Sequence, residues 1–255
     1  MDKKAPVIVV TGAAGGLGRI LTGMLRARGC NVACVDRDAR TLEAVIKETG
    51  GPGEAIAFIA EASSAADTKN VIDGTVKKWG HIDGLFLGAA INGDPGQLHT
   101  ISEEMFEKVV GTNLKSVWLA VKYAVPAMIE SGGGAIVTVG SVAATRGAPT
   151  LGVYAASKHG VLGLTRTLAL EYAKQNIRAN ILCPGSMDTA MIQPMLLLRG
   201  GGDAEKGLAA TVAGIPNGRL AKPQELASVG LWLLLDAPSH LNGQEITVDG
   251  GRTAA

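Results

Sequence analysis

The sequence predicts an α/β fold in which a mostly parallel, doubly wound sheet of about seven strands is covered by helices on both faces. Short runs rich in Val, Ile, Ala and Leu alternate along the chain with amphipathic helical patterns. The short runs are apolar at consecutive positions, as strands buried on both faces must be. Because parallel strands need crossover connections, which are usually helices, this alternation favours a parallel sheet.

The expected elements follow in chain order. Strands are expected at Val7–Val10, Val32–Val35, Ala55–Ile59, Ile82–Leu87, Ala135–Val139, Ile177–Leu182 and Glu245–Val248. Helices are expected between most of them, near Leu17–Arg28, Arg40–Glu48, Ala65–Trp79, Ser102–Ser131, Tyr154–Lys174 and Pro223–Leu235. Pro126 is expected to kink the fourth helix, since proline lacks a backbone N–H. The stretch 186–217 is irregular, with glycines at 200–202.

The composition predicts one cytoplasmic domain. A chain of 255 residues can form one large open sheet, so a single domain over 1–255 is expected. Its 24 Lys and Arg and 23 Asp and Glu give a net charge of +1, which argues against nucleic acid and membrane partners. Cys30, Cys34 and Cys183 lack metal-ligand partners at close spacing, so we expect buried thiols in a reducing compartment and no metal site.

A glycine-rich loop joins the first expected strand to the first expected helix. It reads Thr11-Gly12-Ala13-Ala14-Gly15-Gly16-Leu17-Gly18. Positions without side chains let the backbone approach a pyrophosphate, whose charge is stabilised at a helix start. Asp36 ends the second strand eighteen residues after Gly18, near the spacing of a carboxylate that accepts hydrogen bonds from an adenosine ribose. The pair predicts a dinucleotide site; a plain glycine-rich turn beside a solvated acidic loop is the alternative.

Three polar side chains are expected to meet beyond the fifth strand. Tyr154 and Lys158 are four residues apart on a helix, so they share one face. Ser141 follows the strand Ala135–Val139, at the edge where open α/β sheets bind ligands. Taken alone, such a pair more often consists of an amphipathic aromatic residue beside a solvated lysine. Together the three residues could converge beside a bound cofactor.

These motifs resemble those of the short-chain dehydrogenase/reductase family over essentially the whole chain. The glycine loop resembles the family's cofactor loop, and Tyr154-x-x-x-Lys158 its signature pair. Ser141, thirteen residues before the tyrosine, and Asn113 resemble its serine and its asparagine. Pro184-Gly185 and the terminal Val248-Asp249-Gly250-Gly251 also fit. The resemblance implies a single-domain Rossmann-type fold and hydride transfer between NAD(H) and a secondary alcohol or ketone.

The resemblance also implies a role for each site residue. Tyr154 is expected to be the acid–base group, its pKa lowered by the Lys158 ammonium and the oxidised nicotinamide. Ser141 is expected to hydrogen-bond the substrate oxygen, and Asn113 to hold a water that links Lys158 to solvent. Besides Tyr154 and Lys158, the expected cofactor-binding residues are Gly12, Gly15, Gly16, Leu17, Gly18, Asp36, Arg37, Glu61, Ala62, Gly88, Ala89, Pro184, Gly185, Met187 and Thr189.

Two segments depart from the family's pattern. Leu87-Gly88-Ala89-Ala90 stands where the family usually has Asn-Asn-Ala-Gly, so two asparagine side chains are replaced and a methyl group is added on the nicotinamide side. Glu61-Ala62 stands where an aspartate and an apolar residue normally lie beside the adenine. Neither departure removes a group that does chemistry.

The residues near the second strand predict a preference for NAD(H) over NADP(H). A 2′-phosphate would lie close to the Asp36 carboxylate and be repelled by it. Arg37 could pair with that phosphate and would weaken the preference without reversing it. The resemblance also points to a second position that could bind the 2′-phosphate, the residue before Gly16. This residue is Gly15 and not a lysine or arginine, so no side chain is available there to bind the phosphate.

The segment 186–217 is expected to be a mobile lid over the substrate. Six of its apolar residues have helical spacing: Met191, Ile192, Met195, Leu196, Leu197 and Leu198. The glycines at 200–202 could act as a hinge. A lid rich in Met and Leu favours a small apolar alcohol or ketone as the substrate. Arg199 could meet an anionic substrate tail, although a solvated charge is the simpler interpretation.

Two other functions and an oligomeric state follow from the resemblance. A 3-oxoacyl-thioester reductase of the same fold usually uses NADPH, so Asp36 argues against it. A non-catalytic dinucleotide sensor would not need the complete set Asn113, Ser141, Tyr154 and Lys158. A homotetramer is expected, and eight apolar residues on two long helices are expected to support it: Val117, Trp118, Val121, Val125, Val161, Leu164, Leu168 and Leu170.

Overall fold

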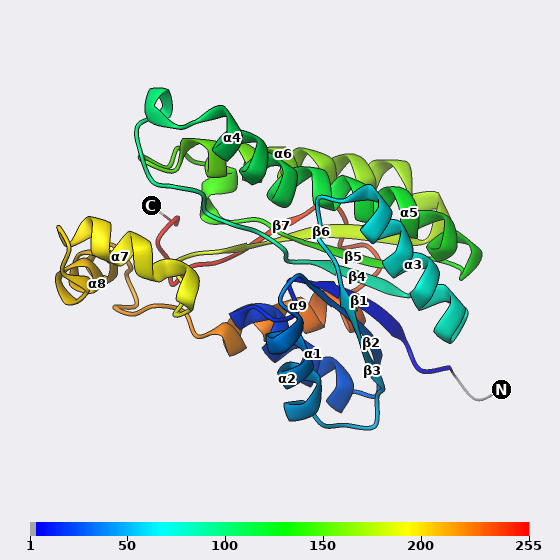
Figure 1. The fold of residues 1–255 in the computed structure, drawn as a ribbon. Coiled ribbons are helices and arrows are strands. Elements are labelled where there is room, and N and C mark those ends of the chain that lie inside the picture. Colours follow the sequence, from blue (N-terminus) through cyan, green and yellow to red (C-terminus); the bar gives the residue numbers. More distant parts are fainter. Residues whose placement is uncertain (1–3, 255) are drawn as a thin grey trace.

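The computed structural model describes residues 4–254, which are built around one seven-stranded sheet (Figure 1). All strand pairs are parallel, and the order is β3-β2-β1-β4-β5-β6-β7. The strands are β1 (Val7–Thr11), β2 (Asn31–Asp36), β3 (Ala55–Ile59), β4 (Gly84–Leu87), β5 (Gly134–Val139), β6 (Ile177–Pro184) and β7 (Glu245–Val248). The order reverses between β1 and β4, and ligands of such sheets bind at this reversal. The predicted doubly wound fold is confirmed.

Helices form a layer on each face of the sheet (Figure 1). One layer contains α1 (Gly16–Ala27), α2 (Ala39–Glu48) and α9 (Pro223–Leu235). The other contains α3 (Ala65–Trp79), α4 (Glu103–Val110), α5 (Ser116–Glu130) and α6 (Gly152–Glu171). Two further helices, α7 (Gln193–Arg199) and α8 (Ala204–Ala213), lie beyond the carboxyl edge of the sheet.

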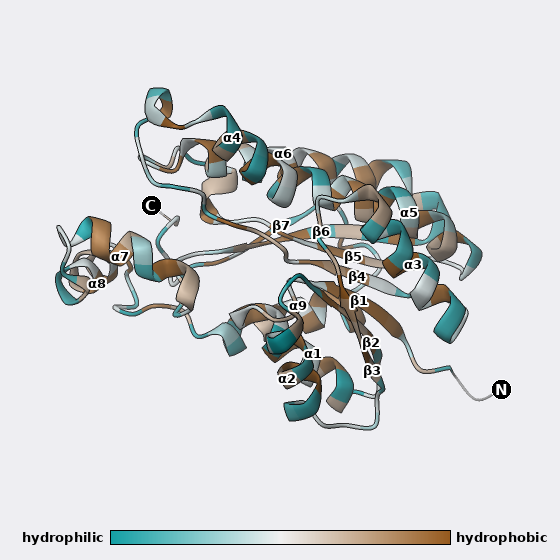
Figure 2. Ribbon diagram, in the orientation of Figure 1, coloured by the Kyte–Doolittle hydropathy of each residue, from teal (hydrophilic) through white to brown (hydrophobic). Residues whose placement is uncertain are grey.

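Alternation along each strand divides the core between the two layers. In β1, Val9 packs into the core on the α3–α5–α6 side, whereas Ile8 and Val10 pack into the core on the α1–α9 side. Successive side chains of a strand point to opposite faces, so a strand between two layers must be apolar at every position. Figure 2 shows the strands as a hydrophobic band between helices whose outer surfaces are largely hydrophilic.

The predicted helix over 102–131 forms, but its irregularity lies elsewhere than expected. A π-helical segment, Gly111–Lys115, joins α4 to α5. Helix α5 then continues through Pro126 to Glu130. Single π-helical turns inside longer helices often occur at functional sites, and this one places Asn113 in the interior, where it is only 1% exposed.

The outcomes for cysteines and for the apolar helix residues differ. All three cysteines are buried free thiols, as predicted. Of the eight apolar residues expected to support an oligomer, however, five are buried within the chain itself: Val117, Val121, Val125, Val161 and Leu168. Trp118 and Leu170 remain 47% and 83% exposed. The apolar pattern of α5 and α6 therefore reflects mostly the core of one chain.

Across residues 4–254, we find no helix whose length and apolar character would let it cross a membrane.

Candidate active site

The carboxyl ends of the central strands surround a cavity of about 630 Å³. Most of the predicted site residues line it: Gly12, Gly15, Gly16, Leu17, Gly18, Gly88, Ser141, Tyr154, Lys158, Pro184, Gly185, Met187 and Thr189. They follow β1, β4, β5 and β6, so four loops and the start of α6 bring them together. Six predicted residues lie outside this wall: Asp36, Arg37, Glu61, Ala62, Ala89 and Asn113.

The glycine loop fits an anionic cofactor because its backbone is bare. Gly12 has a φ of +72°, and a Cβ there would lie 3.0 Å from the Ala89 nitrogen. A Cβ on Gly18 would lie 2.2 Å from the Gly12 carbonyl oxygen, so α1 starts in close contact with the loop. No side chain caps α1 and no acidic residue occupies its first turn. Helices α2, α3, α4 and α8, in contrast, begin at a capping Asp or Ser side chain. The amides at the start of α1 are thus available to a phosphate.

Asp36 lies beside this loop although it is outside the cavity wall. One carboxylate oxygen accepts the Ala14 N–H at 3.0 Å, and the other accepts the Asp38 N–H at 3.2 Å. The carboxylate therefore joins the end of β2 to the glycine loop, and Arg37 beside it is exposed. Glu61 is turned toward its own loop, where its carboxylate accepts the Ser63 hydroxyl at 3.2 Å.

The segment after β4 is supported by Thr11 in place of asparagine side chains. The Thr11 hydroxyl oxygen accepts the N–H groups of Gly88 at 3.1 Å and Ala89 at 3.3 Å. A Cβ on Gly88 would lie 3.1 Å both from the Thr11 carbonyl oxygen and from the Phe86 ring. The departure at 87–90 therefore keeps its backbone fixed against β1.

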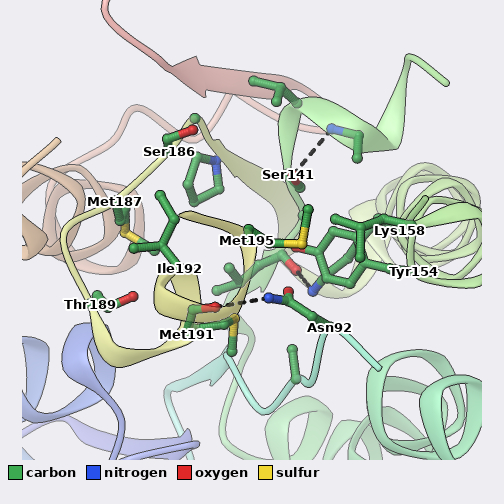
Figure 3. Close-up of a pocket in the computed structure, with 18 of the residues that line it drawn as sticks. Asn92, Ser141, Tyr154, Lys158, Ser186, Met187, Thr189, Met191, Ile192 and Met195 are labelled. Atoms are coloured by element: carbon green, nitrogen blue, oxygen red, sulfur yellow. Dashed lines mark hydrogen bonds between the residues drawn. The ribbon is translucent and has the colours of Figure 1, made fainter. Parts of the chain in front are cut away.

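Tyr154, Lys158 and Ser141 converge at the centre of the cavity (Figure 3). The Lys158 ammonium donates to the Val139 carbonyl oxygen at 2.7 Å and lies 5.6 Å from the centroid of the Tyr154 ring. Lys158 is 2% exposed. Burial penalises the ammonium and lowers the pKa of Lys158 to about 8.

In the protein without a cofactor, the pKa of Tyr154 lies above its ordinary value. Burial raises it, because a tyrosinate in this wall would lose solvation, and the Ser141 hydroxyl acts in the opposite direction. The expected lowering depends on the oxidised nicotinamide as well as on Lys158, so it stays a prediction for the complex with the cofactor. Ser141 accepts the Ala143 N–H at 3.1 Å, which fixes the position of its hydroxyl oxygen in the cavity wall.

Asn113 fastens the loop after β4 to α6. Its side-chain oxygen accepts the Ile91 N–H at 2.8 Å, and its nitrogen donates to the Ile91 carbonyl at 2.9 Å and to the Ser157 hydroxyl at 3.0 Å. Ser157 in turn donates to the Tyr154 carbonyl oxygen at 2.6 Å. Because both amide hydrogens are donated to protein atoms, the predicted water would have to be held by another atom of Asn113.

The lid side of the cavity carries the residues after β6. Thr189 lies against the glycine loop, since a Cβ on Gly16 would be 2.8 Å from its methyl carbon. Met191, Ile192 and Met195, farther along the same segment, also point into the cavity (Figure 3). Asn92, which the sequence reasoning missed, donates from its side-chain nitrogen to the Met191 carbonyl oxygen at 3.0 Å.

The glycines at 200–202 lie between α7 and α8, so they flank the apolar segment 191–198 as expected, and their role as a hinge stays a prediction. The two helices are in close contact, because a Cβ on Gly207 would lie 1.8 Å from the Leu196 carbonyl oxygen. Helix α8 was also missed, although the side chain of Asp203 caps it by accepting the N–H groups of Glu205 and Lys206. That cap, followed by good helix formers, was the available signal.

Other wall residues were also absent from the predicted set. Arg146 lies on the loop after β5, Ser186 on the loop after β6, and Arg252 follows β7. Arg199, considered only as a weak candidate, lines the cavity as well. Their positions after successive strands were the signal that could have found them.

Comparisons with known proteins agree with this geometry. A family model described as enoyl-(acyl carrier protein) reductase matches residues 12–253. The chain is 38% identical over 255 residues to a 2,5-dichloro-2,5-cyclohexadiene-1,4-diol dehydrogenase from Sphingobium indicum, covering 99% of both chains. It is 36% identical over 252 residues to a 3-oxoacyl-(acyl-carrier-protein) reductase from Thermotoga maritima, covering 98% of this chain and 99% of the relative.

Two solved structures are similar over nearly the whole chain. The crystal structure of levodione reductase matches with a TM-score of 0.95 and 33% identity, covering 98% of both chains. A 3-ketoacyl-(acyl-carrier-protein) reductase from Brucella melitensis, complexed with NADH, matches with a TM-score of 0.87 and 30% identity, covering 98% of this chain and 99% of the other.

Proposed function

The chain belongs to the short-chain dehydrogenase/reductase family and is an oxidoreductase acting on CH–OH groups, and we propose that it oxidises a cyclic secondary alcohol with NAD⁺ or reduces the corresponding ketone with NADH. The observation that carries this proposal is the convergence of Ser141, Tyr154 and Lys158 in one cavity that also contains the glycine loop. This loop leads into α1, whose first backbone amides have no side-chain cap. The cavity is bordered by Met and Ile side chains, which suit the carbon skeleton of a ring.

The residues of this chain fit a nicotinamide dinucleotide, which supplies the hydride donor or acceptor when bound. The bare amides of Gly16–Gly18 at the start of α1 would hold its pyrophosphate. Asp36 would accept the hydroxyls of the adenosine ribose, and Lys158 would donate to the other ribose. The backbone at Met187 and the hydroxyl of Thr189 would contact the carboxamide.

Tyr154 would exchange the hydroxyl proton with the substrate. In the oxidation direction its phenolate oxygen accepts the alcohol proton, and in reduction its hydroxyl donates a proton to the carbonyl oxygen. Ser141, positioned by the Ala143 N–H, would donate to the same substrate oxygen. The buried Lys158 ammonium would stabilise the phenolate, which burial alone disfavours.

The proposal is tested by incubating the protein with NAD⁺ and cyclohexanol, cyclohexane-1,4-diol or butan-2-ol and following NADH at 340 nm. We expect turnover of the cyclic alcohols at a higher kcat/KM than the acyclic one. Absence of turnover for all three alcohols, and for their ketones with NADH, would contradict the proposal.

A 3-oxoacyl-thioester reductase is the second candidate, favoured by the similarity to the Thermotoga maritima reductase. The two functions differ in substrate size and cofactor. Acetoacetyl-CoA with NADPH tests this candidate, because a thioester reductase should turn it over faster than any ketone lacking the thioester. The non-catalytic sensor would bind NADH, seen by fluorescence titration, and turn over neither substrate class.

The cofactor preference, the assembly and the domain organisation complete the proposal. Asp36 favours NAD(H), for the electrostatic reason given above. We propose one domain with a lid over 186–217, in a cytoplasmic homotetramer. Helices α4, α5 and α6, which we expect to pair with their copies, leave Phe106, Trp118 and Leu170 50%, 47% and 83% exposed. Light scattering at micromolar concentration tests the tetramer, and a monomer would contradict it.

A further inference from the structure

The cavity wall has an unbalanced charge. Its ionisable cations are Arg146, Lys158, Arg199 and Arg252, and within residues 4–254 no Asp or Glu lines it. The protein as a whole has a net charge of only +1. Positive charge is thus concentrated at the cavity. Of the four cations in its wall, Lys158 is the one that takes part in the proposed reaction.

The three arginines gather around the segment after β7, since Arg146 donates to the Thr253 carbonyl oxygen and Arg199 is close enough to Arg252 to be affected by its charge. Along the carboxyl edge the glycine loop follows β1, Ser141 follows β5, the Ser186 loop follows β6 and Arg252 follows β7. Neighbouring strands are about 4.8 Å apart, so the segment that carries Arg252 leaves the sheet roughly 10 Å beyond the end of β5, on the side away from the glycine loop. These cations are therefore not at the end where the dinucleotide phosphates would bind.

Each guanidinium is fastened by a neutral oxygen. Arg252 donates from Nη1 to the Ser186 hydroxyl at 3.2 Å, Arg146 from Nη2 to the Thr253 carbonyl at 2.7 Å, and Arg199 from Nη1 to the Thr211 hydroxyl at 2.9 Å. A guanidinium has five N–H donors, so most of each fork remains free.

Carboxylates nearby are engaged with the backbone. The Asp249 carboxylate interacts electrostatically with Arg146, which helps to lower the pKa of Asp249. Its oxygens accept the N–H groups of Gly251 at 2.9 Å and Thr253 at 2.8 Å. Arg199 and Arg252 are close enough that their charges repel. Among the described residues, none of the three arginines forms an ion pair with an acidic side chain.

We propose that this arginine cluster, Arg146, Arg199 and Arg252, binds an acidic group of the substrate. The proposal rests on the proposed function and narrows its substrate class to a ring or short apolar skeleton that carries a secondary hydroxyl at one end and a carboxylate at the other. The Met and Ile side chains of the lid would cover the skeleton, Ser141 and Tyr154 would meet the hydroxyl, and the guanidinium forks would meet the carboxylate oxygens. Under this proposal the substrate is amphiphilic, with an apolar skeleton and one acidic group.

The test compares two substrates of closely similar size and shape, the charged 3-hydroxycyclohexanecarboxylate and the neutral 3-hydroxycyclohexanecarboxamide, with NAD⁺. Wild-type protein should prefer the carboxylate by at least about tenfold in kcat/KM. Arg252→Gln and Arg199→Gln should each reduce this preference several-fold while changing kcat/KM for the amide by less than about threefold. Arg252→Lys keeps a charge and should retain part of the preference. Lys206→Gln, which removes an exposed lid cation outside the cavity, is the control and should leave it unchanged.

Two outcomes overturn the inference and leave the proposed function intact. One is equal kcat/KM for the acid and the amide in wild type; the other is a loss in the arginine variants that is the same for both substrates. Binding without turnover separates the two proposals. Cyclohexanecarboxylate should raise the melting temperature of the wild-type protein more than cyclohexanecarboxamide does, and Arg252→Gln should remove the difference, even if the alcohols prove not to be substrates.

Discussion

The two sides of the cavity are built differently. The floor, formed by the glycine loop, Ser141, Tyr154 and Lys158, rests on strand ends and on the first turns of α6. Lys158 is only 2% exposed in it. The lid, residues 186–217, extends beyond the sheet, and its Leu197 and Leu198 are 45% and 47% exposed.

This difference separates chemistry from selection. The floor residues are held by hydrogen bonds to the backbone of neighbouring elements, such as that from Lys158 to Val139. Groups that react must keep their relative positions, and rigid strand ends provide this. The lid is joined to the opposite wall through Asn92 and Met191, and it contributes apolar side chains and Arg199 to the cavity. Substitutions in the floor should thus affect kcat, and substitutions in the lid KM and substrate preference.

The largest expected effect is in the floor. Tyr154→Phe should lower kcat by at least about 100-fold, because the phenylalanine ring cannot exchange the hydroxyl proton. Affinity for NADH, measured by fluorescence titration, should stay within a few-fold of wild type. A variant that keeps most of its kcat with the best alcohol would remove Tyr154 from the chemistry.

The next effect tests Asp36, which lies beside the glycine loop of the floor. Asp36→Ala should reduce the ratio of kcat/KM for NAD⁺ to that for NADP⁺ by about ten- to a hundred-fold, because repulsion of the 2′-phosphate is relieved. Asp38→Ala is the matched control, since this neighbouring carboxylate caps α2 through the Thr41 N–H. If Asp38→Ala changes the ratio as much, or Asp36→Ala leaves it unchanged, Asp36 is not the discriminator.

A lid substitution should change KM. Gly207→Ala places a methyl group where the Leu196 carbonyl lies, so α7 and α8 must separate. The KM for the alcohol should rise about tenfold while kcat falls much less. Gly214→Ala, at the end of α8 with its nearest contact 3.7 Å away, should behave like wild type. A fall in kcat with unchanged KM would contradict the division between floor and lid.

The smallest effect measures the burial of the floor itself. The folded pKa of Lys158 is about 8, below the ordinary value of about 10.4. Between these values the unfolded chain binds more protons than the folded one, so the free energy of unfolding contributed by this group rises with pH. Without cofactor, wild type should gain roughly 1–2 kcal/mol relative to Lys158→Met between pH 7.5 and 9.5, measured by urea unfolding. Tyr154→Phe, which keeps the lysine, should show the same gain; a gain that is absent or reversed in wild type would contradict the burial argument.

The same division describes what the sequence could predict. Strands β3 and β7 begin and end at the predicted residues. The local sequence pattern of apolar residues is enough to determine where these strands begin and end. The floor residues were predicted from local signals: the glycine loop from its motif, Ser141 from the end of a strand, and Tyr154 and Lys158 from their spacing on a helix and the family resemblance. The π-helical turn at Asn113, the contact of Gly207 with Leu196 and the meeting of Arg252 with Ser186 depend on packing between distant segments. Nothing in the local pattern encodes these, and they shape the lid and the arginine cluster.

The contact between α7 and α8 has a consequence for amide hydrogen exchange. With Gly207 against the Leu196 carbonyl, neither helix can move far without the other. Their backbone amides should therefore lose protection in one cooperative opening, faster than those of α6 and slower than those of an isolated loop. A ligand that holds the lid should slow exchange in both helices by the same factor, including α8, none of whose residues lines the cavity.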